Sequence, residues 1–184
     1  MTTNVTVNVS VTKVKKRKNH PTYKGKFHFQ QVEPLEEIYV KKNGNIDAFK
    51  APDDLAITFN WVSDAVEIDD ALYEAYYCTP HNDSIWVLPG EDSEPGEGDK
   101  APPDGDHDIT VPDGPAKRSL TLKDRNDLDK RYKYSFVVHL EIGGGALLIE
   151  DPKIINKTIK PRMAPGKPRH KPIGAPPPGT NANS

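Results

Sequence analysis

One stretch of the sequence has the spacing of a metal-binding loop: three aspartates at alternate positions, Asp104, Asp106 and Asp108. Carboxylates at this spacing can converge on one calcium ion, as the first three ligands of an EF-hand loop do. The rest of that loop is missing, because Ile109 and Pro115 stand where its glycine and its bidentate glutamate belong. The pattern leaves two interpretations. One is an irregular calcium site completed by other carboxylates of the same loop, and the other is a solvated acidic loop.

The histidines, the cysteine and the serines form no recognisable catalytic or zinc-binding motif. None of the six histidines has a zinc-ligand spacing, and no nucleophile elbow or phosphate loop occurs. Cys78 precedes His81 by three residues, but catalytic pairs are neighbours in space, so this spacing is no evidence for one. We interpret Cys78 as a small core residue and His139 as a structural, hydrogen-bonded histidine. We predict a protein that is not an enzyme and has no cofactor other than the calcium considered above.

Five basic residues between positions 13 and 18 have the composition of a phosphate-binding segment. No aromatic residues are interleaved with them to stack on bases, and the net charge of the chain is −2. We therefore predict a solvated loop and no nucleic-acid partner.

The sequence has no apolar run long enough for a membrane helix and no signal-peptide core. The single cysteine cannot form an internal disulfide, so the chain requires no oxidising compartment. These features predict a cytoplasmic protein that does not contact a membrane.

The remaining residues must form the elements that position these groups, and the clearest element is a long hairpin. Residues 132–142 and 146–159 are rich in aromatic and β-branched side chains and are joined by three consecutive glycines. Residues 4–14, 26–30 and 54–61 alternate apolar and polar side chains, which predicts strands with one buried face. Shorter strands are predicted at residues 84–88, 109–111 and 119–123, and an Asn-Gly hairpin between residues 38 and 49.

Residues 62–77 are ambiguous, and we favour one irregular helical turn there over a strand within residues 72–78. With almost no other helical period, the predicted fold is an all-β, immunoglobulin-like antiparallel β-sandwich covering residues 1–160. Residues 90–108 form an acidic loop with eight acidic residues and one lysine. Because this loop has too few apolar residues to bury, we predict that it is mobile unless something binds it.

Residues 161–184 are rich in proline, glycine and basic residues, and we predict a disordered or polyproline II tail. Such a tail has the composition of a ligand for aromatic grooves. Its positive charge also suggests the hypothesis that it pairs with the acidic loop of the same or a neighbouring molecule. That pairing would make self-association sensitive to salt.

Two dipeptides, Glu33-Pro34 and Asp151-Pro152, each lie beside strand-like sequence. In this respect the chain resembles the bacterial DP-EP family, which is named after such dipeptides. The resemblance implies an immunoglobulin-like fold and carries over no catalytic residues.

These observations predict a non-enzymatic binding or structural module that acts through contacts with another protein or through self-association. The alternative is a calcium-dependent recognition domain with its ligands in the acidic loop. A recognition domain is expected to place exposed aromatic side chains such as Trp61 or Trp86 on a concave face beside that loop. A structural module is expected to show an exposed apolar patch or a long unpaired edge strand.

Overall fold

The computed structural model of the chain describes residues 1–90, 92–126 and 131–155. Within them the structure is almost entirely β, which confirms the all-β part of the predicted fold. The strands are β1 (Thr2–Lys16), β2 (Tyr23–Glu33), β3 (Asp54–Trp61), β4 (Val66–Ile68), β5 (Ala71–Tyr73), β6 (Ala75–Tyr77), β7 (Ile85–Pro89), β8 (Ile109–Thr110), β9 (Ser119–Asp124), β10 (Arg131–Leu140), β11 (Ala146–Glu150) and β12 (Lys153–Ile155). Two short 3-10 helices, η1 (Ala48–Lys50) and η2 (His81–Ser84), complete the described elements.

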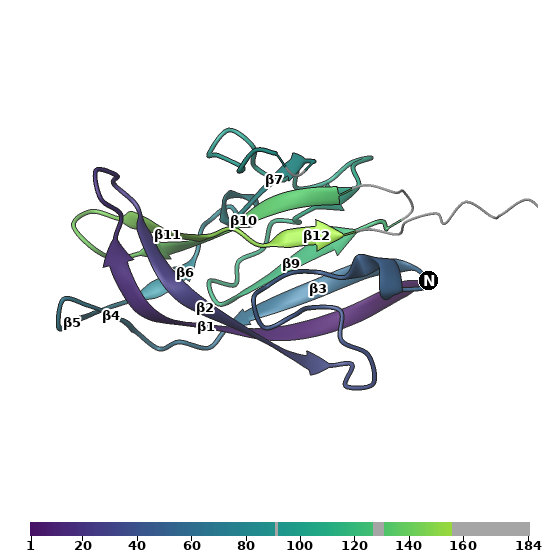
Figure 1. The fold of residues 1–184 in the computed structure, drawn as a ribbon, viewed down its shortest axis with the longest axis horizontal. Helices are drawn as coiled ribbons and strands as arrows, with labels where there is room; N and C mark the ends of the chain where they lie inside the picture. The colour runs from purple at the N-terminus through teal and green to yellow at the C-terminus, as the bar shows by residue number, and fades with distance from the viewer. Residues whose placement is uncertain (91, 127–130, 156–184) are drawn as a thin grey trace, which may run out of the picture.

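The strands form one curled, mixed sheet and a separate small hairpin of β4 and β5. β6 and β7 pair with one edge of β10, and β11 and β12 pair with its other edge. From β11 the sheet continues through β2, β1, β3 and β9 to β8. Figure 1 shows β1, β2 and β3 along one side of the molecule and β10 and β7 along the other. The sheet has the shape of a half-barrel that encloses the core.

The predicted immunoglobulin-like sandwich is not clearly formed, because the two halves remain joined in a single sheet. β11 and β2 meet through the pair Leu148 and Tyr23, and β1 runs parallel to β3. The register of the β1–β2 pair shifts between Thr12 and Lys15, where Lys13 has a φ of 54°. An irregularity of this kind bends a strand and increases its twist. The bend lies next to the point where β2 turns to meet β11.

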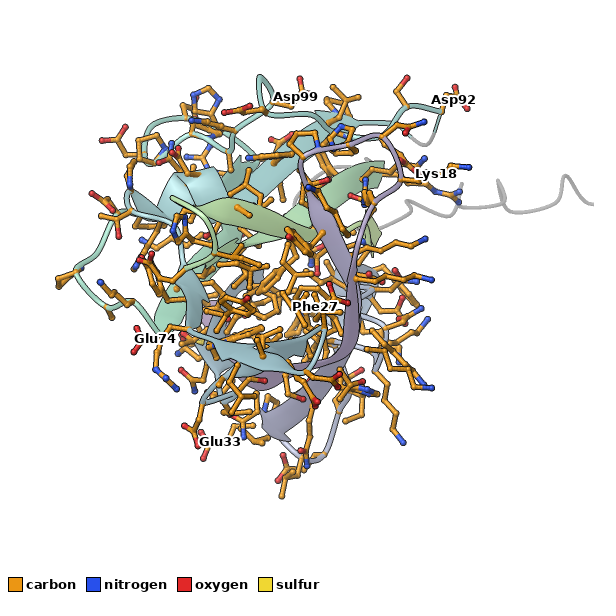
Figure 2. The ribbon with its side chains drawn as sticks, turned by 90° about the vertical axis from the view of Figure 1, so that its left-hand side faces the viewer. Lys18, Phe27, Glu33, Glu74, Asp92 and Asp99 are labelled. Carbon is orange, nitrogen blue, oxygen red and sulfur yellow. The ribbon has the colours of Figure 1, made fainter. Side chains whose placement is uncertain are left out.

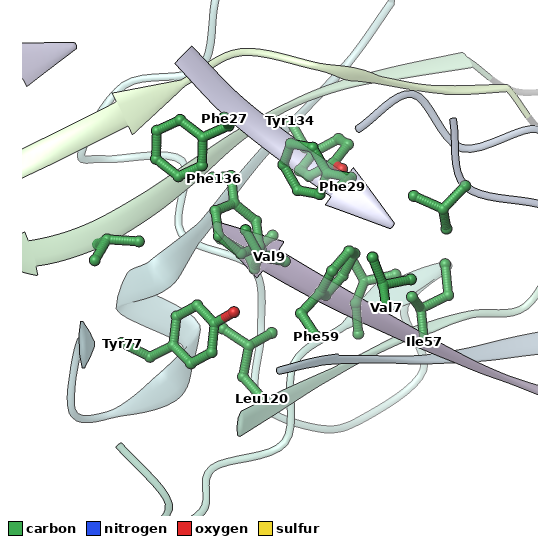
Figure 3. Close-up of a cluster of buried hydrophobic side chains, with 14 of the residues drawn as sticks. Val7, Val9, Phe27, Phe29, Ile57, Phe59, Tyr77, Leu120, Tyr134 and Phe136 are labelled. Carbon is green, nitrogen blue, oxygen red and sulfur yellow. The ribbon is translucent and has the colours of Figure 1, made fainter. Parts of the chain in front are cut away.

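The enclosed core is centred on Phe136 of β10 (Figure 3). Its ring centroid lies 5.9, 5.4, 5.3 and 5.6 Å from those of Phe27, Phe29, Phe59 and Tyr77. These rings come from β2, β3, β6 and β10, so one side chain links strands far apart in the sequence. The predicted inward alternation of β1, β2 and β3 is confirmed by the burial of every second side chain along them.

The prediction of a helical turn in residues 62–77 is wrong. This segment contains β4, β5 and β6. Asp69 and Asp70 form the turn between β4 and β5, with φ angles of 49° and 64°. A two-residue hairpin turn of type I′ requires positive φ at both positions, and aspartate tolerates this better than most residues. The turn places Leu72, which is 72% exposed, at a projecting hairpin.

The predicted strand over residues 146–159 is interrupted at Asp151-Pro152 and resumes as β12 in the same register against β10. Proline has no N–H to donate to the sheet, which explains the interruption. Residues 156–159 and the predicted tail, residues 161–184, lie outside the described residues. Within the described ranges, no helix has the length and apolar character needed to cross a membrane.

Candidate functional site

The outer face of the sheet around β10 carries a second, smaller hydrophobic cluster. Successive side chains of a strand point to opposite faces, so the residues between the inward-facing aromatics of β10 face outward. Val137 contacts Trp86 and Ile149 there, and all three side chains are buried. His139, next on this face, is paired across the sheet with Tyr76 on one side and Leu147 on the other. The strands thus present a row of aromatic and aliphatic side chains outside the main core.

The acidic loop lies against this outer face and is tied to it by hydrogen bonds. Ser135 Oγ donates to the carbonyl oxygen of Pro95 at 3.3 Å. The N–H of Val87 donates to the Asp99 carbonyl oxygen at 2.7 Å, and the N–H of Ala101 donates to the Ile85 carbonyl oxygen at 2.9 Å. The described part of the loop is therefore held as an extension of the sheet edge. The mobility of the loop stays a prediction, and these hydrogen bonds are contacts that its composition alone does not predict.

Two adjoining depressions of about 400 and 470 Å³ are open on this face. Both are lined by Trp86, Glu97 and Leu147, so they meet at these residues. We call them together the outer groove. Trp86 lies beside the acidic loop and lines the groove, but its side chain is buried, at 6% exposed, and not exposed as expected of a recognition domain. Trp61, the other tryptophan, is buried in the main core.

The first depression contains a connected set of polar and aromatic side chains. The Tyr76 ring stacks on His139, and the Lys117 ammonium lies 4.4 Å from the centroid of the Tyr76 ring on β6. The Tyr76 hydroxyl donates a hydrogen bond to the Glu141 carboxylate. This hydrogen bond, together with burial and the negative charge of Glu141, raises the pKa of Tyr76 to about 12. Lys100 Nζ lies 3.0 Å from Asp83 Oδ1, so its charge is also paired.

Cys78 lies in the same depression, and its surroundings do not activate it. Burial raises the pKa of its thiol, and a protonated thiol is a poor nucleophile. His81 is directed elsewhere, because its Nε2 donates to the carbonyl oxygen of Ala116 at 2.8 Å. The sequence neighbours Cys78 and His81 therefore make separate structural contacts.

The second depression lies between the acidic loop and the turn that joins β1 to β2. Arg17 and His20 line it from the turn, and Glu94 and Glu97 line it from the loop. Arg17 Nη2 lies 3.7 Å from Asp151 Oδ2 and is partly withdrawn from solvent, unlike the lysines that surround it in sequence. Figure 2 shows Lys18, Asp92 and Asp99 on the same side of the molecule. Asp151 lines the same depression and pairs with Arg17, so the acidic wall of the groove faces a wall whose arginine charge is already offset.

The structure places the three aspartates of the predicted calcium site away from the outer groove. Asp104 and Asp108 line a separate depression beside β3 and β9. Asp106 forms an ion pair with Arg125, and the Tyr132 hydroxyl donates to Asp108. Among the residues that the structure describes, no three or more His, Cys, Asp or Glu side chains are grouped to hold a metal ion. Calcium binding by Asp104, Asp106 and Asp108 stays the alternative hypothesis, and a solvated acidic loop stays the favoured interpretation.

His139 is the site residue whose position the sequence interpretation missed. It lies half-buried on the outer face, stacks on Tyr76 and lines the groove, and the interpretation of its role as structural stays a prediction. The alternation along β10 contained the signal, because His139 is an odd number of residues from Tyr132, Tyr134 and Phe136. Gly145 makes room for its ring, since a Cβ on Gly145 would lie 2.8 Å from His139 Cε1.

No protein-family model matches the chain, and a search of curated proteins finds no match. The resemblance to the DP-EP family, drawn from Glu33-Pro34 and Asp151-Pro152, stays a prediction. The function is therefore argued from the geometry of the outer groove.

Proposed function

We propose that the protein is a non-enzymatic binding module that holds an extended segment of a protein partner in the outer groove. The observation that carries this proposal is the meeting of two depressions at Trp86, Glu97 and Leu147. Together they provide an aromatic and aliphatic floor between charged walls, the combination that favours recognition of an extended peptide. Aromatic side chains at the centre of a binding surface also contribute a large share of affinity.

The state of the polar groups supports binding over catalysis. Tyr76 is engaged by Glu141, Lys100 by Asp83, and the Cys78 thiol has a raised pKa. A general base or nucleophile needs a pKa tuned toward the working pH. These groups instead shape and charge the walls of the groove.

The test is binding of the intact protein to an array of extended peptides of varied composition. Leu147→Lys places a charge on the floor of the groove and is expected to abolish or strongly weaken binding. Leu72→Lys makes the same substitution at the exposed β4–β5 hairpin and is expected to leave it unchanged. Peptide binding that survives Leu147→Lys, or that is lost equally in both variants, would contradict the proposal. Self-association through the groove would appear in a separate measurement of molecular mass. The mass would rise with protein concentration for wild type and not for Leu147→Lys.

A further inference from the structure

We infer that the outer groove is occupied by the chain's own basic, proline-rich segment, residues 161–184, within the same molecule. This inference rests on the proposed function, because it assigns an occupant to the same groove. Three observations lead to it: the charge of the acidic loop, the position at which the described chain ends, and the composition of the segment that follows.

The acidic wall of the groove has unpaired negative charge. Glu94 and Glu97 both line the groove and are exposed. In the described part of the chain, neither has an ion-pair partner. The single lysine of the loop, Lys100, has its ammonium 3.0 Å from Asp83, outside the loop, and Glu97 acts on it only as a weaker electrostatic neighbour. Backbone groups of Pro95, Asp99 and Ala101 are hydrogen-bonded to the sheet, and the two exposed carboxylates lie at the edge of the groove beside them.

The described chain ends close to where the acidic loop begins. Ile155, at the end of β12, is paired with Arg131 of β10. On the other side of β10, the N–H of Gly90 donates to the Arg131 carbonyl at 2.8 Å. Adjacent strands are about 4.8 Å apart, so the chain leaves β12 about 10 Å from the start of the loop. Twenty-nine residues follow Ile155. At about 3.1 Å per residue they span far more than this distance.

The composition of residues 161–184 fits both the floor and the acidic wall of the groove. The segment contains seven prolines, four lysines and arginines, and no aspartate or glutamate. Proline-rich segments lose little conformational entropy on binding and dock on aromatic-lined grooves. Tyr76, which is half-buried, and Trp86, which is 6% exposed, line the aromatic part of the groove, and Glu94 and Glu97 supply the opposite charge. A short connection also gives a tethered segment a high effective concentration.

The test is zero-length carbodiimide cross-linking of the full chain at low protein concentration, followed by isolation of the monomer and peptide mapping. We expect amide links from Lys167 or Lys171 to Glu94 or Glu97. Their yield should fall in about 1 M salt, where the Debye length is about 3 Å. Glu97→Lys should lower the yield of links to Glu94 about two- to fivefold, the range of one exposed ion pair. Glu67→Lys, the same charge change at an exposed site on β4, should leave it unchanged.

Three results would overturn the inference. The first is a set of cross-links spread evenly over Glu67 and other distant carboxylates. The second is a cross-link yield that Leu147→Lys does not change. The third is cross-links found only in the dimer, which would assign the segment to a second copy. The peptide array separates this failure from failure of the proposed function. If the tail occupies the groove, replacing Lys167, Arg169 and Lys171 with glutamine should strengthen peptide binding. Peptide binding that depends on Leu147 but is unchanged by the glutamine substitutions would retain the binding module and reject the tail as its occupant.

Discussion

The ring of Tyr76 stacks on the imidazole of His139, with the two ring centroids 5.0 Å apart and an angle of 26° between the ring planes. The two residues are directly paired between β6 and β10. Glu141, two residues after His139, accepts a hydrogen bond from the Tyr76 hydroxyl. The wall of the outer groove is therefore an organised set of groups, and its order can be measured through the ionisation of Tyr76.

We predict that Tyr76 ionises near pH 12 in the folded protein and that Glu141→Gln lowers this value toward 10. The hydrogen bond to Glu141 is the main cause of the raised pKa, and the neutral amide removes the negative charge that opposes ionisation. Because the folded pKa lies above the unfolded one, the stabilising contribution is present below pH 10 and is lost between about pH 10 and 12. Absorbance titration of wild type against Tyr76→Phe isolates the signal of this residue. An unchanged Tyr76 pKa in Glu141→Gln would contradict the hydrogen-bond assignment.

Two buried tyrosines of the main core are predicted to respond differently to loss of their hydroxyl groups. The Tyr134 hydroxyl donates to the Gly44 carbonyl at 2.7 Å. The Tyr77 hydroxyl is buried without a hydrogen-bond partner in the described part of the chain. Tyr134→Phe is expected to lower the free energy of unfolding by about 1 kcal/mol, and Tyr77→Phe to leave it unchanged or raise it. Urea denaturation measures both, and a larger loss for Tyr77→Phe than for Tyr134→Phe would show that the hydrogen bonding is assigned wrongly.

Local patterns predicted the strands well, while contacts between distant segments set the curvature and the site. The alternating valines of β1 predicted its buried face, and the three glycines predicted the turn between β10 and β11. The parallel pairing of β1 with β3 joins residues 2–9 to residues 54–61, which no local pattern specifies. The irregularity at Lys13 likewise bends β1 without a glycine to mark it. The single sheet therefore could not be distinguished from a sandwich.

The outer groove illustrates the same limit at the level of the site. Trp86 and His139 were both noted in the sequence, but their roles depend on which face each side chain occupies and on what covers it. The acidic loop was interpreted from its composition alone, which has few apolar residues. Its attachment combines backbone hydrogen bonds to β7, which do not depend on side-chain type, with contacts of Ser135 and Asp83 that are distant in sequence. Sequence reasoning therefore identified the components of the groove but not their assembly.

Phe136 is predicted to be the residue whose truncation costs the most stability. It is fully buried and its ring contacts four other aromatic rings from three other strands. Phe136→Ala should therefore lower the free energy of unfolding by about 3–5 kcal/mol, as large-to-small substitutions in cores do. Phe49→Ala, at a side chain that is 46% exposed, is the matched control and should cost less than about 1 kcal/mol. Similar losses in the two variants would mean that the aromatic cluster does not organise the core.

The final prediction concerns Asp104, Asp106 and Asp108, for which we expect no rise in melting temperature when excess chelator is replaced by excess calcium. Calcium requires six to eight oxygen ligands. Here the ion would have to displace Arg125 from Asp106 and Tyr132 from Asp108. A ligand at 100 times its dissociation constant adds about 2.7 kcal/mol, or several degrees for a domain of this size. A rise of that size, absent when all three aspartates become asparagine, would contradict this expectation. It would show that calcium rearranges the acidic loop. A calcium-dependent recognition domain would then explain the protein better than a groove that binds its partner without metal.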